Sequence, residues 1–119
     1  MKGEAALALL CLAVAACGET SQVQVAGGDH KRGREFLERY GCGSCHLVPG
    51  IASARGQVGP PLDGIGRRSY LGGVLPNTPD NMVAWIRHPQ KFEPDTAMPD
   101  LGVSEPEARD MTAYLYTIR

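Results

Sequence analysis

The sequence predicts an all-α domain of three main helices joined by long loops. Three segments place apolar residues at helical spacing, and a residue able to cap a helix precedes each of them. No segment alternates polar and apolar residues over the length of a strand. The 119 residues include 15 glycines and 9 prolines, which favour turns and loops between the helices.

The N-terminal segment has the pattern of a targeting signal. Lys2 is followed by an apolar run from Ala5 to Ala16, which is too short to span a bilayer but typical of a secretory signal. The run ends in Val14-Ala15-Ala16-Cys17, which resembles the bacterial lipoprotein signal. The resemblance implies that residues 1–16 are a signal peptide and that Cys17 carries lipid. Ordinary secretion, with cleavage after Ala16 and no lipid, is the alternative.

Residues 17–29 are expected to be a lipidated cysteine followed by a flexible tether. The stretch from Gly18 to Asp29 is polar and interrupted by glycine. A flexible coil of this length spans about 20 Å, and acyl chains at its start would hold the domain at a membrane. We therefore expect an exported, lipid-anchored protein, at the outer face of the cytoplasmic membrane or in the periplasm.

The folded domain is expected over residues 30–119 and begins with a helix at 30–40. Asp29 can cap this helix and Gly41 can end it. Its apolar face consists of Phe36, Leu37 and Tyr40. Residues 47–75 contain seven glycines and three prolines, so we expect loop there.

Two further helices follow this loop. Thr78 and Pro79 fit the cap and first turn of one helix, and Pro89 is expected to end it. Its apolar residues are Met82, Val83, Trp85 and Ile86. After an irregular stretch, Ser104 and Glu107 have the spacing of a capping box at the start of a helix that runs to about Ile118.

The motif Cys42-Gly43-Ser44-Cys45-His46 predicts covalent attachment of a haem. Two thiols at this spacing can add to the two vinyl groups of a haem, and the adjoining imidazole can then bind the iron. A redox pair of the thioredoxin kind would need strands around it. A structural zinc site would need further ligands, and a plain Cys42–Cys45 disulfide is the simplest alternative. The haem interpretation is favoured.

A haem held by one imidazole needs a ligand on its other face. Met82 and Met111 lie on apolar helix faces, where packing is their expected role. Met98 instead lies in a turn-rich loop, Asp95-Thr96-Ala97-Met98-Pro99. His88 would give a site with two histidines, but it stands at a helix end, where a surface role is expected.

From Gly33 to Tyr116 the chain resembles a class I cytochrome c. The residues that carry the resemblance are Gly33, Phe36 and Leu37, the haem motif, Gly59-Pro60, and Thr96-Ala97-Met98-Pro99. The resemblance implies the cytochrome c fold, with the helices and loops wrapped around one covalently bound haem c. It also implies that His46 and Met98 are the axial ligands, and that the first and last helices cross at Gly33 and Tyr114.

The resemblance further assigns supporting roles around the haem. The Pro60 carbonyl would bond the His46 ring nitrogen that faces away from iron, and Leu62 would pack on the haem face. Arg67 matches the residue that binds the propionates, with Arg68 as its rival. Trp85 would lie beside the Met98 sulfur, with core packing as the alternative role.

A narrower resemblance links residues 73–81 and 85–90 to the cytochrome c domain of caa-type haem-copper oxidases. It suggests the type of partner, a haem-copper oxidase as acceptor. Together with the lipoprotein signal and the class I resemblance, it implies a membrane-tethered electron carrier, not an enzyme, that passes single electrons between respiratory-chain proteins towards a terminal oxidase. The alternative is a haem-based sensor or peroxidatic enzyme with a displaceable sixth ligand. A net charge of −1 gives no reason to expect a nucleic-acid partner.

Overall fold

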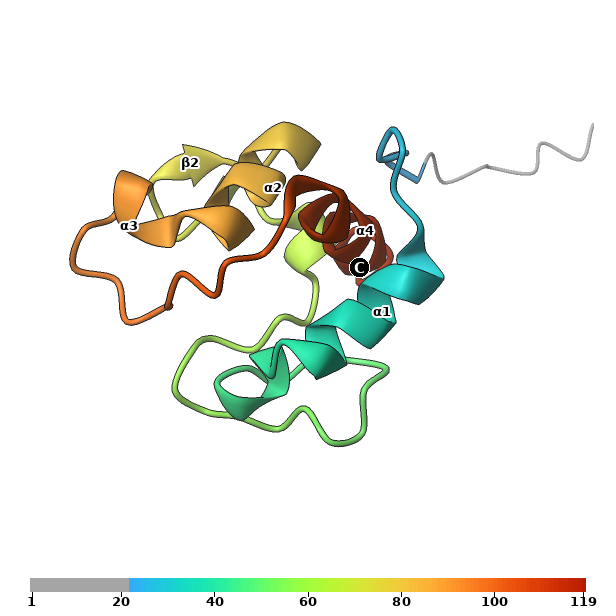
Figure 1. Cartoon of the computed structure of the whole chain (residues 1–119), viewed down its shortest axis with the longest axis horizontal. Helices are drawn as coiled ribbons and strands as arrows, with labels where there is room; N and C mark the ends of the chain where they lie inside the picture. Colours follow the sequence, from blue (N-terminus) through green and yellow to red (C-terminus); the bar gives the residue numbers. More distant parts are fainter. Residues whose placement is uncertain (1–21) are drawn as a thin grey trace, which may run out of the picture.

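The structure is a computed structural model that describes residues 22–119. The predicted signal peptide, Cys17 and the start of the tether lie outside the described residues. Within them, the structure contains four α-helices, two 3₁₀ turns and one two-stranded hairpin (Figure 1). In chain order these are α1 (His30–Arg39), η1 (Cys42–Ser44), η2 (Ile65–Arg67), β1 (Tyr70–Leu71), β2 (Leu75–Pro76), α2 (Pro79–Arg87), α3 (Pro89–Phe92) and α4 (Glu105–Leu115).

Helices α1 and α4 cross at Gly33, as predicted. A Cβ atom at Gly33 would lie 1.9 Å from the Asp110 carbonyl oxygen and 3.0 Å from the Met111 nitrogen. Only glycine therefore allows the two backbones to approach this closely. Tyr114 has a different role: its hydroxyl donates a hydrogen bond of 2.8 Å to the Pro49 carbonyl and so ties α4 to the loop after the haem motif.

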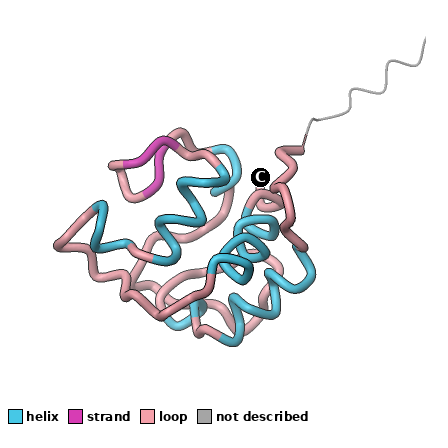
Figure 2. Tube along the Cα trace, turned by 45° about the horizontal axis from the view of Figure 1, so that its top comes forward, coloured by secondary structure: helices cyan, strands magenta, loops and turns pink. Residues whose placement is uncertain are grey.

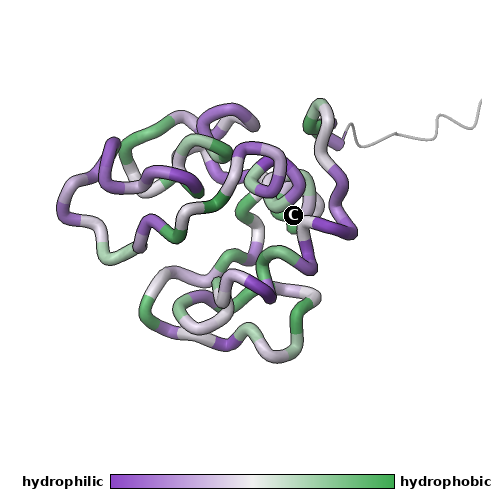
Figure 3. The backbone as a smooth tube through the Cα atoms, viewed as in Figure 1, coloured by the Kyte–Doolittle hydropathy of each residue, from purple (hydrophilic) through white to green (hydrophobic). Residues whose placement is uncertain are grey.

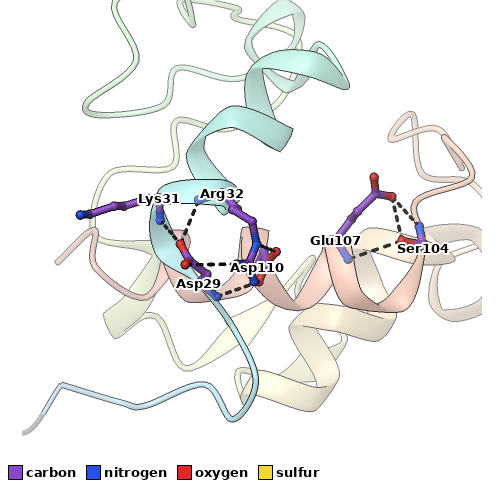
Figure 4. Close-up of polar contacts among 6 residues, drawn as sticks. All are labelled: Asp29, Lys31, Arg32, Ser104, Glu107 and Asp110. Atoms are coloured by element: carbon purple, nitrogen blue, oxygen red, sulfur yellow. Dashed lines mark hydrogen bonds and ion pairs between the residues drawn. The ribbon is translucent and has the colours of Figure 1, made fainter.

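All three predicted helix caps are present. The Asp29 carboxylate accepts hydrogen bonds from the Lys31 and Arg32 backbone N–H groups, and Thr78 accepts one from Asn81. Ser104 and Glu107 form the capping box of α4. Figure 4 shows this box together with Asp29 and the groups that Asp29 contacts. Each cap satisfies backbone donors that a helix start leaves open, so these boundaries follow from local sequence.

The core is formed where α4 packs on α1 and on α2, with the loops around them. Met82 and Met111 lie there fully buried, with 2% and 0% of their surface exposed. Figure 3 shows hydrophilic residues at the start of α1 and in the middle of α3. The described helices include none that is long and apolar enough to cross a bilayer.

Three features differ from the predicted elements. Tyr70–Leu71 and Leu75–Pro76 pair as an antiparallel hairpin (magenta in Figure 2) where only loop was expected. Its turn uses Gly72 and Gly73, both at positive φ. Pro89 opens the four-residue helix α3 as well as following α2, because proline suits the first turn of a helix. The last helix ends at Leu115, three residues before the predicted Ile118.

The end of the predicted tether packs on the domain. Val25 is only 8% exposed and belongs to the core, and a Cβ at Gly28 would lie 2.8 Å from the Arg109 carbonyl oxygen in α4. The Asp29 N–H donates a 2.7 Å hydrogen bond to the buried Asp110 carboxylate. Val25 to Asp29 therefore contact the domain, which corrects the expectation of a free chain up to residue 29.

Candidate haem site

The haem motif lies on one tight turn at the end of α1. Gly41 adopts φ 71°, which reverses the chain after the helix and starts η1. The Cys45 and His46 N–H groups both donate to the Cys42 carbonyl, at 3.2 and 3.0 Å. Cys42 and Cys45 are free, partly buried thiols, and burial raises the pKa of the Cys42 thiol. The turn thus presents two unpaired thiols and an imidazole within five residues.

The loop that follows holds this turn through its backbone. The Gly56 N–H donates to the Gly43 carbonyl at 2.9 Å, and the Gly59 N–H donates to the Cys45 carbonyl at 2.7 Å. A Cβ at Gly56 would lie 2.5 Å from backbone atoms of Ser44 and Cys45. The motif is therefore braced by main chain at distances that only glycine permits.

The His46 ring is oriented by Gly59 and Pro60. Its Nδ1 lies 2.7 Å from the Pro60 carbonyl oxygen. Since a carbonyl oxygen can only accept a hydrogen bond, Nδ1 carries the proton, and Nε2 of the neutral ring offers its lone pair. A Cβ at Gly59 would lie 2.3 Å from His46 Cε1, so the backbone at Gly59 packs directly on the imidazole. The ring is thereby set up to bind a metal through Nε2.

The remaining residues assigned on this side differ in their surroundings. Leu62 is half-buried and packs on the core, and its N–H donates to the Leu47 carbonyl at 2.9 Å. The Arg68 guanidinium donates to the backbone carbonyls of Pro61 and Asp63. Arg67 is exposed; its N–H donates to the Gly64 carbonyl at 2.9 Å, but its guanidinium takes part in none of the hydrogen bonds or ion pairs found within residues 22–119. Arg68 thus braces the loop after Pro60, which leaves Arg67 as the cation available to a ligand.

Trp85 lies on α2. Its ring is half-buried and packs on the core, and the hairpin turn lies against it, since a Cβ at Gly72 would be 2.4 Å from the Trp85 ring edge. The hairpin therefore covers the indole from one side. Both the core role and a place beside a bound haem are compatible with this position.

Met98 lies in the loop between α3 and α4, which Figure 1 draws above the segment that carries the haem motif. Its side chain is half-buried. Its N–H donates to the Thr96 hydroxyl oxygen at 3.2 Å, and its carbonyl accepts a 2.6 Å hydrogen bond from Gln90 Nε2. His88, the other candidate ligand, pairs instead with Asp100 at the surface, with Nδ1 3.0 Å from Oδ2. That hydrogen bond lowers the pKa of the Asp100 carboxyl.

The donor set suits a covalently bound haem. Such a cofactor needs two thiols, an imidazole, a second axial ligand and a cation for its propionates. The structure offers two free thiols, an imidazole with an available Nε2, a thioether in a half-buried loop and an exposed arginine. Within residues 22–119, no group of three or more His, Cys, Asp or Glu side chains could hold a metal ion. The zinc interpretation therefore has no ligand set in this part of the chain.

The family profile for cytochrome c matches residues 30–119. The chain belongs to this family as a class I cytochrome c, an electron carrier that binds one haem c covalently. It is 33% identical over 108 residues to a cytochrome c2 of Rhodopila globiformis, a match that covers 77% of this chain and 95% of the relative.

Two other relatives are larger proteins named cytochrome c oxidase subunit 2. The chain is 34% identical over 89 residues to the protein of Alkalihalophilus pseudofirmus, covering 74% of this chain and 25% of the relative. It is 32% identical over 84 residues to the Bacillus subtilis protein, covering 66% of this chain and 24% of the relative. The chain thus spans about a quarter of each oxidase subunit.

Three residues that support the site were not predicted from the sequence: Gly56, Asn77 and Gln90. Asn77 Nδ2 donates to the Ile65 and Arg68 carbonyls, both at 2.8 Å, and so holds the turn that carries Arg67. Its Oδ1 accepts the Tyr116 hydroxyl. Asn77 and Gln90 each follow a proline and lie in the segments 73–81 and 85–90 that resemble the oxidase domain, but neither signal assigned them a role.

Proposed function

We propose that this chain is a lipid-anchored, mono-haem cytochrome c that passes single electrons towards a terminal oxidase of a respiratory chain. Cys42 and Cys45 would form the thioether bonds, and His46 and Met98 would be the axial ligands. The bound haem supplies one-electron redox chemistry, with iron moving between Fe(II) and Fe(III). The observation that carries the ligand assignment is the 2.7 Å contact between His46 Nδ1 and the Pro60 carbonyl, which leaves Nε2 for iron.

Each proposed residue has a separate task. The Pro60 carbonyl keeps the imidazole in one tautomer and one orientation. Leu62 and Trp85 would shield the haem from water, and such burial favours the reduced iron, as does a methionine ligand. Arg67 would offset the charge of a propionate. Together these groups hold the ligand set unchanged while an electron arrives and leaves.

Replacement of Met98 tests this assignment against a sensor or peroxidatic enzyme. In the wild type, carbon monoxide should change the spectrum of the reduced protein only slowly at neutral pH. In Met98→Ala the sixth position is open, so carbon monoxide should bind readily and the potential should fall. Met82→Leu is the control, because Met82 is a buried core residue. Ready binding of carbon monoxide to the wild type would favour the alternative function.

The lipid anchor is tested by Cys17→Ser. The motif Val14-Ala15-Ala16-Cys17 supports the anchor. We therefore expect the wild-type protein to sediment with membranes and the variant to be secreted or soluble in the periplasm. Mass spectrometry of the N-terminal peptide should find acyl groups on Cys17. An unmodified N-terminus at Cys17 would show ordinary secretion instead.

The oxidase as acceptor is supported by relatives that are themselves named cytochrome c oxidase subunit 2. The reduced protein should be oxidised by detergent-solubilised membranes that contain a haem-copper oxidase, and cyanide should block this reaction. Co-purification in mild detergent would distinguish a fixed subunit from a free carrier. Oxidation that is equally fast with cyanide present would contradict this choice of acceptor.

A further inference from the structure

The Met98 loop, residues 93–103, contains no helix or strand and is held to the rest of the fold by side chains. Three residues around the α2–α3 junction reach it. Arg87 Nε donates to the Val103 carbonyl at 3.3 Å, His88 pairs with Asp100, and Gln90 donates to the Met98 carbonyl. We call these three contacts the loop clasp.

The Gln90 contact differs from the other two because it acts on the peptide of Met98 itself. Its distance of 2.6 Å joins the Gln90 side-chain nitrogen to the Met98 carbonyl oxygen. The Met98 N–H is held by Thr96 on its other side. With both of its polar backbone groups bonded, Met98 has little freedom to turn its side chain away.

The position of Gln90 is in turn fixed by α3. Pro89 is fully buried, so the first turn of α3 is anchored in the core just before Gln90. The Glu93 N–H closes that turn by donating to the Pro89 carbonyl at 3.0 Å. Gln90 itself is exposed, and its amide reaches the loop from this anchored base. Gln90 therefore contributes little by packing, and its main contact is the hydrogen bond to Met98.

We infer that Gln90 is a positioning residue for Met98. Its hydrogen bond keeps the Met98 peptide in the orientation that directs the thioether into the pocket, and it slows the opening of the loop through which a small ligand would replace that thioether. This inference rests on the proposed role of Met98 as axial ligand, and it adds a residue that does not itself touch the haem.

The test uses the haem-loaded protein and imidazole as the competing ligand. The binding rate of imidazole to the oxidised protein reports how often Met98 leaves, and the long-wavelength charge-transfer band of a thioether on ferric haem reports whether it is bound. Gln90→Ala should bind imidazole about fivefold faster, the factor expected from loss of one ordinary hydrogen bond. Gln24→Ala is the matched control, because Gln24 is exposed and lies in the N-terminal segment.

Two further variants separate the hydrogen bond from the shape of the side chain. Gln90→Lys keeps an N–H donor of similar reach and should return the rate towards that of the wild type. Gln90→Glu has a similar shape but no donor at neutral pH, so it should bind imidazole at least as fast as Gln90→Ala. Equal rates in the Lys and Glu variants would overturn the inference, even if Gln90→Ala folded poorly.

Met98→Ala distinguishes failure of this inference from failure of the proposed ligand set. If the charge-transfer band survives in Met98→Ala, Met98 is not the ligand and the proposed function must be revised. If Met98→Ala removes the band while Gln90→Ala matches Gln24→Ala in imidazole binding, only the positioning role of Gln90 is wrong.

Discussion

The two segments proposed to hold opposite faces of the haem are secured by different parts of the chain. The His46 segment, residues 41–61, is braced by backbone hydrogen bonds from Gly56 and Gly59. The Met98 loop, residues 93–103, is held by side chains of the α2–α3 junction and by Thr96. The His46 segment is thus supported by main chain packed against main chain, with side-chain bonds from Tyr114 and Arg68 in addition. The Met98 loop depends mainly on side-chain bonds that a single substitution removes.

This difference predicts how each segment responds when one of its contacts is lost. Close backbone contacts cannot open one at a time, so a disturbance of the His46 segment should lower the stability of the whole domain. The loop clasp consists of separate side-chain bonds of modest strength, so a disturbance there should increase local opening and leave global unfolding almost unchanged. The four predictions below test this contrast, from the largest expected effect to the smallest.

Gly56→Ala should produce the largest loss of stability. Its new Cβ would lie 2.5 Å from backbone atoms of Cys45, and the backbone of a residue that is proposed to be bonded to the haem cannot move aside cheaply. We expect the free energy of unfolding of the haem-loaded protein to fall by about 1–3 kcal/mol, as for other overpacked sites, measured by urea denaturation. Ser53→Ala is the control, since Ser53 is exposed in the same loop. Equal stability of the two variants would show that the His46 segment is not rigid.

Thr96→Val should act locally. The Met98 N–H loses its acceptor, and the loss of one hydrogen bond corresponds to about fivefold more frequent loop opening. Imidazole should therefore bind the oxidised protein faster by that factor, while the urea midpoint stays close to that of the wild type. A fall in global stability comparable to that of Gly56→Ala would remove the contrast between the two segments.

Tyr40→Phe should make the stability of the domain depend less on pH, because it removes a bond between the end of α1 and α4. The Tyr40 hydroxyl donates to Glu107 at 2.7 Å and, with Ser104, lowers the pKa of the Glu107 carboxyl, whereas the same bond raises the pKa of Tyr40. Because the native pKa of Glu107 is lowered, the bond stabilises the fold at pH values above the unfolded carboxyl pKa of about 4.3. Because the native pKa of Tyr40 is raised, the bond stabilises the fold at pH values below the unfolded phenol pKa of about 10.

The wild type should therefore exceed Tyr40→Phe in stability at neutral pH. The difference should shrink as pH falls through the lowered native pKa of Glu107, or rises through the raised native pKa of Tyr40. Urea denaturation at several pH values measures it, and Tyr70→Phe, which changes an exposed tyrosine, is the control. A difference that is constant from acid to alkaline pH would mean that the Tyr40–Glu107 bond contributes nothing.

Pro60→Ala should have the smallest effect, because the group that contacts His46 is a backbone carbonyl and alanine keeps it. We expect a loss of about 0.4–1 kcal/mol from the greater freedom of the unfolded chain. The His46 ring resonances in an NMR spectrum of the reduced protein should hardly move. A large shift would show that the proline ring itself, and not only its carbonyl, orients the imidazole.

Local features of this protein could be predicted from the sequence because the interactions behind them span only a few residues. The caps at Asp29, Thr78 and Ser104 bond backbone groups two or three positions away, so the residue type and the spacing contain the whole signal. The number of elements was predicted less well. The hairpin and the four-residue helix α3 are too short for any periodicity to show.

The contacts that support the candidate site join residues far apart in the sequence, and these could not be predicted. Val25 is buried against α4, although its neighbours in the chain have the composition of a flexible linker. Gln90 meets Met98 only because α3 turns the chain back towards the loop. Polar residues such as glutamine are common at any surface, and the resemblance over residues 85–90 includes Gln90 without assigning it a role.

By itself, the sequence determined that this protein attaches a haem, because thioether attachment needs only two thiols and an imidazole at fixed spacing in one short segment, Cys42 to His46. The tertiary structure decided how firmly each face of the pocket is built. Glycine backbone at Gly56 and Gly59 fills the space around the motif, and the loop clasp holds the Met98 loop. Such support depends on which atoms approach one another in space, and local spacing along the chain does not contain that information.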